Sequence, residues 1–139
     1  MALTKKQRAE LRMKFGGRCA YCGCELPEKG WYADHVEAAL RKWVFGERQS
    51  NGTRRAVAIG EFWRPENDAI ENLFPACAPC NLFKATLSVD LFREEITRQA
   101  ERARAYSVNF RTAERFGLVE VVEKPVVFWF EKYQEGATA

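Results

Sequence analysis

The sequence predicts a single α+β domain that is organised by a bound metal ion, and three observations support this prediction. Four of the five cysteines fall into two Cys-x-x-Cys pairs. Short segments with helical periodicity alternate with short segments rich in strand-forming residues. The chain has 139 residues, 47% of them apolar, which suits one modest hydrophobic core. We therefore expect one domain over residues 1–139, without internal repeats or linkers.

The cysteine pairs are Cys19-Ala-Tyr-Cys22 and Cys77-Ala-Pro-Cys80, with Cys24 left over. Paired thiolates converge readily on a tetrahedral zinc ion, whereas structural disulfides are rare in a reducing compartment. A thioredoxin-like redox site needs only one such pair and a βαβ context, which this sequence lacks. Zinc is therefore expected on the four paired cysteines, and Cys24 is either a spare thiol or a competitor of Cys22 for the metal.

The first third of the chain contains a helical pattern and then a strand pattern. Residues 4–15 have the apolar spacing of a short amphipathic helix, with Thr4 as its N-cap. Residues 31–33 are strand formers that lead directly into Asp34-His35. The Asp-His pair is therefore expected at the end of a strand.

The segment from residue 36 to residue 71 has the weakest pattern. Residues 38–45 allow a helical turn, residues 49–53 form a loop, and residues 55–62 have weak strand character. Basic residues gather here, namely Arg41, Lys42, Arg48, Arg54 and Arg55. They suit either an arm that grips a phosphate backbone or a solvated loop, and the sequence leaves both alternatives open.

The sequence predicts two helices after the second cysteine pair. One begins at Cys80 and reaches Lys84, with Leu82 and Phe83 packing it down. The other is a longer amphipathic helix over residues 90–106. Its inner face is expected to carry Leu91, Phe92, Ile96, Ala100 and Ala103.

The C-terminal part is expected to form a short helix and then a β-hairpin. The helix covers residues 109–116 and ends at Gly117. Residues 118–122 and 126–130 are strand-like on either side of Pro125. We expect this C-terminal β-hairpin to belong to the core.

The net charge of +3 is unevenly distributed. Residues 1–55 carry twelve Lys/Arg against six Asp/Glu, whereas residues 56–139 carry ten against thirteen. A basic first part suits nucleic acid, although solvated surface charge explains many such imbalances. No stretch approaches the roughly 18 apolar residues that span a bilayer, and the first residues do not resemble a signal peptide. We therefore expect a soluble, cytoplasmic protein with no membrane partner.

Polar residues that can carry chemistry surround the second cysteine pair. The chain presents, in order, Cys19-x-x-Cys22, Asp34-His35, Asn72-Leu73, Cys77-x-x-Cys80-Asn81 and Lys84. This order resembles zinc-stabilised members of the HNH endonuclease family, and the final Asn81 resembles their asparagine-ending HNN variant, of phage or mobile-element type. The resemblance covers about residues 15–88 and assigns no role to the extension at 89–139.

The resemblance implies a ββα-metal, treble-clef-like core that is stabilised by the zinc site. It implies that His35 is the general base that activates water. Asp34 and Asn81 would be ligands of one catalytic divalent ion, and Asn72 would steady the region of His35 through its amide. Because Asn81 replaces the common histidine, the ligands are all oxygen atoms, which favours Mg²⁺ or Mn²⁺.

The implied activity is hydrolysis of DNA phosphodiester bonds. The residues expected to contact DNA are Arg41, Lys42, Arg54, Arg55 and Lys84, although for Lys84 an ordinary surface position is an equal alternative. A phage packaging machine or another enzyme is a possible partner, and the protein is expected to be a monomer or a weak dimer. The rival interpretation is a non-catalytic zinc module that only binds nucleic acid.

Overall fold

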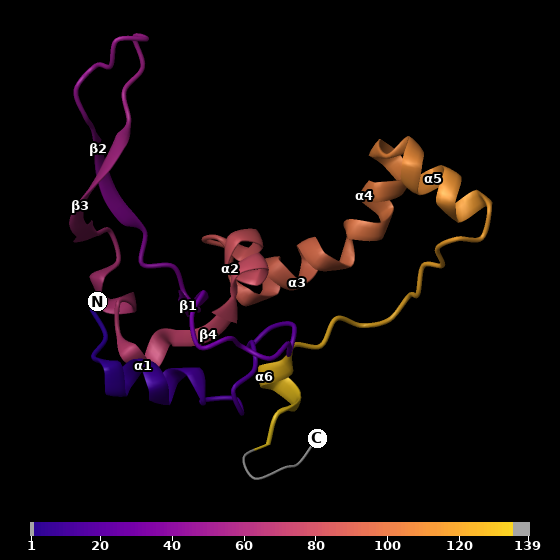
Figure 1. Ribbon diagram of the computed structural model, residues 1–139, viewed down its shortest axis with the longest axis horizontal. Coiled ribbons are helices and arrows are strands. Elements are labelled where there is room, and N and C mark those ends of the chain that lie inside the picture. The colour runs from indigo at the N-terminus through magenta and orange to yellow at the C-terminus, as the bar shows by residue number, and fades with distance from the viewer. Residues whose placement is uncertain (1, 135–139) are drawn as a thin grey trace.

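The protein has a mixed architecture of short helices and two small antiparallel sheets. The structure is a computed structural model and describes residues 2–134 (Figure 1). Its elements are α1 (Lys5–Arg12), β1 (Trp31–His35), β2 (Arg41–Phe45), β3 (Ala56–Phe62), η1 (Pro65–Asn67), η2 (Ile70–Asn72), β4 (Leu73–Cys77), α2 (Ala78–Lys84), α3 (Val89–Thr97), α4 (Gln99–Tyr106), α5 (Val108–Arg115) and α6 (Trp129–Lys132). The expected α+β class is therefore confirmed.

Helix α1 begins where its cap predicts. The Thr4 hydroxyl accepts a hydrogen bond from the backbone N–H of Gln7, and the Gln7 side chain accepts one from the backbone N–H of Thr4. This capping box satisfies donors that the first turn would otherwise leave unpaired. The helix is shorter than expected because it ends at Arg12, ahead of Gly16 and Gly17, which both have positive φ.

Strands β1 and β4 form the antiparallel pair at the centre of the molecule. The register places Trp31 opposite Cys77 at one end and His35 opposite Leu73 at the other. Strand β4 is almost completely buried, and α2 follows it directly. The expected strand before Asp34-His35 is confirmed, and His35 is its last residue.

An aromatic cluster forms the core beside this sheet. Tyr21, Phe92 and Phe128 are mutually in contact, with ring centroids 5.2 to 5.4 Å apart. The C-terminal segment reaches this cluster by packing against the loop that carries the first cysteine pair, where Phe130 donates a backbone hydrogen bond to Ala20. Each fully buried phenylalanine stabilises the fold by about 1.5–3 kcal/mol. Residues near the two ends of the chain therefore share one core.

Strands β2 and β3 form a hairpin that projects away from this centre (Figure 1). The expected strand at residues 55–62 is confirmed, but the helical turn at residues 38–45 is wrong, because residues 41–45 are strand β2. Trp43, Val44 and Phe45 are strand-forming residues that gain backbone partners from β3. A long-range pairing of this kind is not visible in local periodicity.

The helix expected over residues 90–106 is two helices, α3 and α4, which meet at Arg98. Near this junction the Thr97 hydroxyl and the Gln99 amide donate hydrogen bonds to backbone carbonyl oxygens one turn earlier. Such side-chain donors compete with the backbone N–H groups for these carbonyls, which bends helices. Phe92 is buried as expected, whereas Leu91 is half exposed, so its placement on the inner face was wrong. Among residues 2–134, no helix is long and apolar enough to cross a membrane.

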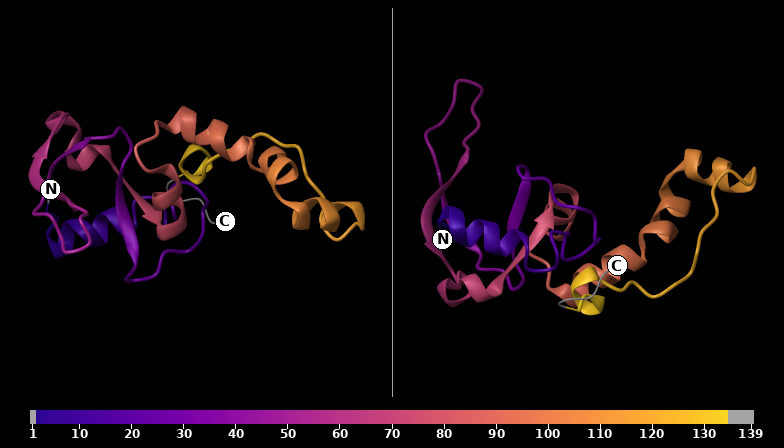
Figure 2. Two further views of the ribbon diagram at one scale, coloured as in Figure 1. Left: turned by 90° about the horizontal axis from the view of Figure 1, so that it is seen from above. Right: turned by 60° about the horizontal axis from the view of Figure 1, so that its bottom comes forward.

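The expectation of a C-terminal β-hairpin is also wrong. Helix α5 is confirmed, but residues 118–128 continue as an extended segment without strand pairing. Leu118 and Val122 are largely exposed on this segment, whereas Phe128 is buried in the core and Val126 packs against it. The backbone then turns into α6 (Figure 2).

Candidate metal centre and adjoining pocket

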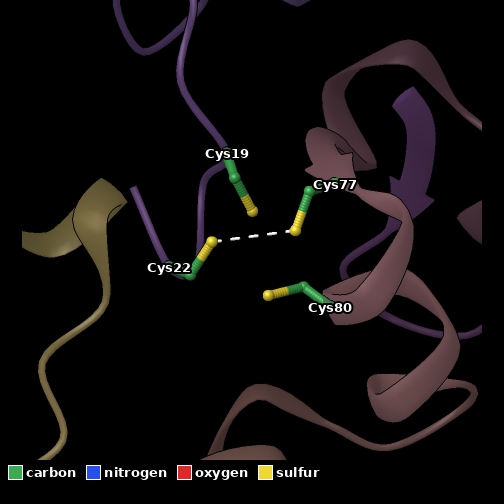
Figure 3. Close-up of side chains that lie close together, drawn as sticks. All are labelled: Cys19, Cys22, Cys77 and Cys80. Carbon is green, nitrogen blue, oxygen red and sulfur yellow. Dashed lines mark hydrogen bonds between the residues drawn. The ribbon is translucent and has the colours of Figure 1, made fainter. Parts of the chain in front are cut away.

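Four cysteine side chains converge at the end of the central sheet (Figure 3). Their sulfur atoms all lie within 4.8 Å of one another, and Cys22 and Cys77 are 3.7 Å apart. A tetrahedral zinc ion with Zn–S bonds of about 2.3 Å separates its sulfur ligands by about 3.8 Å. The cluster of Cys19, Cys22, Cys77 and Cys80 could therefore hold a metal ion such as zinc.

Two tight backbone segments position these cysteines. Cys19 and Cys22 lie on a loop closed by a hydrogen bond from the N–H of Gly23 to the carbonyl of Cys19, and Gly23 has a φ of 79° that favours glycine. Cys77 ends β4, and Cys80 lies in the first turn of α2. Each segment therefore delivers two sulfur atoms to the same point.

The thiol groups of the cluster influence one another's protonation. A hydrogen bond between the side chains of Cys80 and Cys19 lowers the pKa of Cys19 to about 4 and raises the pKa of Cys80. Zinc binds thiolates, so metal binding would release the remaining protons. Cys24 is exposed and is not part of the four-cysteine group, but its thiol interacts with those of Cys22 and Cys77, so a spare thiol and a competitor of Cys22 both stay predictions.

Asp34 is buried and lies between Tyr21 and Lys84. The Tyr21 hydroxyl donates a 2.5 Å hydrogen bond to Asp34 Oδ2, and Lys84 Nζ is 3.1 Å from the same oxygen. Burial raises the pKa of Asp34, and the hydrogen bond from Tyr21 and the charge of Lys84 oppose that shift. Tyr21 lies between the first two cysteines in sequence, so this hydrogen bond links the cysteine loop to β1.

Lys84 does not lie on the surface. Its side chain has no exposed area, and its ammonium also donates to the backbone carbonyl of His35 over 2.9 Å. The expectation that Lys84 contacts DNA is therefore wrong, because phosphate cannot reach a buried ammonium. The expectation that Leu82 holds α2 down is wrong as well, since Leu82 is 76% exposed, whereas Phe83 packs against the buried Phe92 with ring centroids 6.0 Å apart.

His35 is held by an aspartate that sequence reasoning missed. His35 Nε2 lies 2.8 Å from Asp68 Oδ1, and this hydrogen bond lowers the pKa of the Asp68 carboxyl. Asp68 follows η1, far from His35 in sequence. Neither spacing nor composition could have indicated this contact, because the path of the intervening residues determines it.

Asn72 forms hydrogen bonds with the backbone that follows His35. Its side-chain amide accepts a hydrogen bond from the N–H of Glu37 and donates to the carbonyls of Glu37 and Asn67. Its backbone carbonyl also accepts a hydrogen bond from Val36. These contacts agree with the expected steadying of the His35 region, although they act on the backbone and not on the imidazole ring.

Asp34, His35 and Asn81 line one open pocket of about 470 Å³. Asp34 and His35 come from β1, and Asn81 comes from the first turn of α2. Arg41 and Phe62 from the base of the β2–β3 hairpin complete one side. The three side chains that were expected to act together are therefore gathered around one cavity.

Two strained residues also line this pocket. Leu40 and Ala85 have φ values of 56° and 47°, in a region that non-glycine residues rarely adopt. Such conformations cost about 1–3 kcal/mol and persist where the surrounding structure imposes them. Leu40 directly precedes β2, and Ala85 directly follows α2.

The remaining residues expected to bind DNA differ in their surroundings. Arg41 lines the pocket, and Arg54 and Arg55 are exposed near the tip of the hairpin. Lys42 lies 3.5 Å from Glu61, which offsets its charge. Arg41, Arg54 and Arg55 thus remain accessible to a phosphate backbone, while Lys42 is partly neutralised.

The two groups of side chains offer different donor atoms. Thiolate sulfur suits zinc, whereas carboxylate and amide oxygen suit a hard cation such as Mg²⁺. Helix α2 contributes Cys80 to the first group and Asn81 to the second, so the two sites have a common support. No family model, no curated protein and no solved structure matches this chain.

Proposed function

We propose that the protein is a metal-dependent DNA endonuclease of the HNH type, whose ββα-metal core consists of β1, β4 and α2 beside a structural zinc ion. One observation carries this proposal: Asp34, His35 and Asn81 line the same pocket, and Asn81 directly follows Cys80 of the four-cysteine cluster. The residues combine a general base with two oxygen ligands for a cation, and metal-dependent phosphodiester hydrolysis uses these groups.

His35 is the general base in this proposal. Because Asp68 accepts a hydrogen bond at Nε2, a neutral His35 carries its proton on Nε2 and leaves the lone pair on Nδ1. Nδ1 can then remove a proton from the attacking water. Asn72 keeps the chain after His35 in place through its hydrogen bonds to Glu37.

Asp34 and Asn81 would hold the catalytic cation. Both described bonds of Asp34 use Oδ2, so Oδ1 is the oxygen that remains for a metal. Asn81 offers the amide oxygen from α2. A bound Mg²⁺ or Mn²⁺ would neutralise the charge that develops on the phosphate and on the leaving oxygen.

The proposal is tested by the cleavage of supercoiled plasmid by zinc-loaded protein with Mg²⁺, Mn²⁺, Ca²⁺ or no added cation. We expect nicked or linear DNA with Mg²⁺ or Mn²⁺ and none without a cation. His35→Ala should abolish cleavage while it retains zinc. Glu37→Gln is the matched control, because this exposed side chain lies two residues away and should leave cleavage unchanged. Equal cleavage by His35→Ala would overturn the proposal.

A second candidate function is a zinc module that binds nucleic acid without cutting it. The observation in its favour is the neutralisation of Asp34 by Lys84, which lowers the attraction of the carboxylate for a further cation. This alternative requires salt-sensitive DNA binding and no cleavage with any divalent cation. The plasmid experiment therefore separates the two functions.

A further inference from the structure

The β2–β3 hairpin has no buried side chains, so it forms no hydrophobic core of its own. We call residues 41–62 the arm; almost all of its side chains are exposed, and it projects from the centre in Figure 1 and in the right panel of Figure 2. A two-stranded ribbon alone is only marginally stable in water. The arm therefore has a large surface that a partner can cover.

The two faces of the arm differ in chemistry. Trp43 and Phe45 lie two residues apart on β2 and share one face, which we call the aromatic face, whereas a register shift in the pairing with β3 lies between Arg41 and Trp43. The Trp43 and Phe45 rings lie 4.9 Å apart and are 52% and 61% exposed. They stand opposite Ala58 and Ala56, whose small side chains leave the rings uncovered.

The opposite face carries smaller apolar side chains and a neutralised charge. Val44 and Val57 are paired across the two strands. Lys42 lies against Glu61 and also above the ring of Trp63, 4.7 Å from its centroid. Val44 and Val57 carry neither a ring nor a charge, so they provide a matched control for Trp43 and Phe45.

The charge of the arm favours an anionic partner. The arm contains five basic side chains against two acidic ones. Arg41, Arg48, Arg54 and Arg55 form no ion pair within residues 2–134. Exposed arginines beside exposed aromatic rings are the combination that binds nucleic acid, since arginine holds phosphate and the ring stacks on a base.

The base of the arm borders the pocket, and the register shift lies between this base and the aromatic face. Arg41 and Phe62 are paired at the base of the arm, and both line the cavity that contains His35. A strand that lies along Trp43 and Phe45 and extends to this base would enter the pocket at Arg41. In this position a phosphate of that strand can approach Asp34 and His35.

We propose that the aromatic face of the arm binds DNA with unpaired bases by stacking them on Trp43 and Phe45, while the arginines hold the phosphates. A paired duplex presents polar base edges in its grooves, to which Trp43 offers a single indole N–H and Phe45 no hydrogen-bonding group. Unpaired bases present flat apolar faces that match the rings. The inference rests on the proposed function, because it takes DNA as the substrate, and it names single-stranded or branched DNA as the preferred class.

The test is binding of zinc-loaded protein to fluorescent oligonucleotides in the absence of added divalent cations. A single strand of about 20 nucleotides, which exceeds a typical single-strand site, is compared with its duplex. The wild type should prefer the single strand. The double variant Trp43→Ala/Phe45→Ala should lose at least about tenfold in affinity for the single strand and less than about threefold for the duplex.

Two further variants keep the result interpretable. Val44→Ala/Val57→Ala removes comparable apolar groups from the opposite face and should change neither affinity by more than about twofold. Trp43→Phe/Phe45→Tyr retains stacking rings and should keep the single-strand preference. Zinc content and the unfolding midpoint check that each variant remains folded.

Three outcomes would overturn the inference. One is an equal loss of affinity for single strand and duplex, and another is no loss for either. The third is a wild-type dimer that Trp43→Ala/Phe45→Ala dissociates, since a second copy would then cover the aromatic face. Failure of the proposed function is distinguishable, because single-strand binding without cleavage by any cation would retain this inference and reject the nuclease.

Discussion

The four-cysteine centre and the arm are stabilised in different ways. In the centre, Ala20 and Ala76 have no exposed surface, and the buried Asp34–Lys84 pair joins β1 to α2. In the arm, Val44 and Phe45 remain at least half exposed, and stability comes mainly from backbone pairing between two strands. The comparison indicates that the centre holds groups in fixed positions, whereas the arm has little side-chain packing of its own.

The largest expected effect comes from removing a cysteine of the centre. Cys77→Ala should lose the metal and several kcal/mol of stability, because binding of structural zinc contributes directly to folding. Zinc content and thermal unfolding by circular dichroism measure both effects. Cys24→Ala is the control and should keep stoichiometric zinc. Zinc retained in Cys77→Ala but lost in Cys24→Ala would contradict the assignment of the cluster.

The next effect concerns the buried ion pair. Lys84→Met leaves the charge of Asp34 without its partner, so we expect a loss of about 3–5 kcal/mol in the free energy of unfolding. Urea denaturation measures it. Lys6→Met is the control, because Lys6 is exposed on α1, and it should stay within about 0.5 kcal/mol of the wild type.

A second variant shows whether charge is the cause. Asp34→Asn in the Lys84→Met background should recover part of the stability, since the amide oxygen can still accept from Tyr21. An equal loss in the single and double variants would mean that packing of Lys84, and not its charge, joins α2 to β1.

Asp68→Asn should change His35 without changing the fold. We expect about 10- to 100-fold slower DNA cleavage, the usual cost of losing a group that orients a site residue. His35 is the only histidine, so its nitrogen NMR signals are unambiguous. At about pH 9, where an imidazole is ordinarily neutral, the proton should reside on Nε2 in the wild type and redistribute in Asp68→Asn.

The control for Asp68 is a nearby acidic residue without this contact. Glu66→Gln removes the same charge from the exposed side of η1 and should leave the tautomer and the rate unchanged. A wild-type histidine with its proton on Nδ1 would contradict the role of Asp68.

The smallest effect is expected in the helical extension. Hydrogen bonds from Arg102, Arg104 and Arg93 lower the pKa values of Glu95, Glu114 and Glu131. A lowered native pKa contributes stability above the ordinary glutamate pKa of about 4.3, and this is lost as pH falls through the native value.

Glu114→Gln tests this effect. In this variant the unfolding midpoint should decrease less steeply than in the wild type between about pH 5 and pH 3. At neutral pH the midpoint should shift by less than about 2 °C, because the ion pair is exposed. Thermal unfolding across that pH range measures both. A large change at neutral pH would mean that the Arg104–Glu114 pair anchors α5 to α4.

Features that depend on short spacings could be predicted from the sequence. The cysteine pairs converge, Thr4 caps α1, and His35 ends β1 because neighbouring residues determine each of these features. The gathering of Asp34, His35 and Asn81 also agrees with expectation. Their order in the chain and the cysteine pairs limit where they can lie.

Features that depend on distant segments could not be predicted. Local sequence patterns indicate a surface lysine at Lys84, whereas the packing of α2 against β1 buries it beside Asp34. Asp68 contacts His35 although the whole arm lies between the two residues in sequence. Strand β2 likewise requires β3, and residues 118–128 stay unpaired because no strand lies beside them among the described residues.

The most direct test of the central claim is the single-turnover rate constant of DNA cleavage by wild-type protein and His35→Ala, both carrying one zinc ion, at saturating Mg²⁺. Loss of a general base lowers such rates by about 10²- to 10⁴-fold, and we expect a decrease in this range with zinc content unchanged. Equal rate constants would show that His35 is not the base and would contradict the proposed division between a structural zinc site and a catalytic pocket.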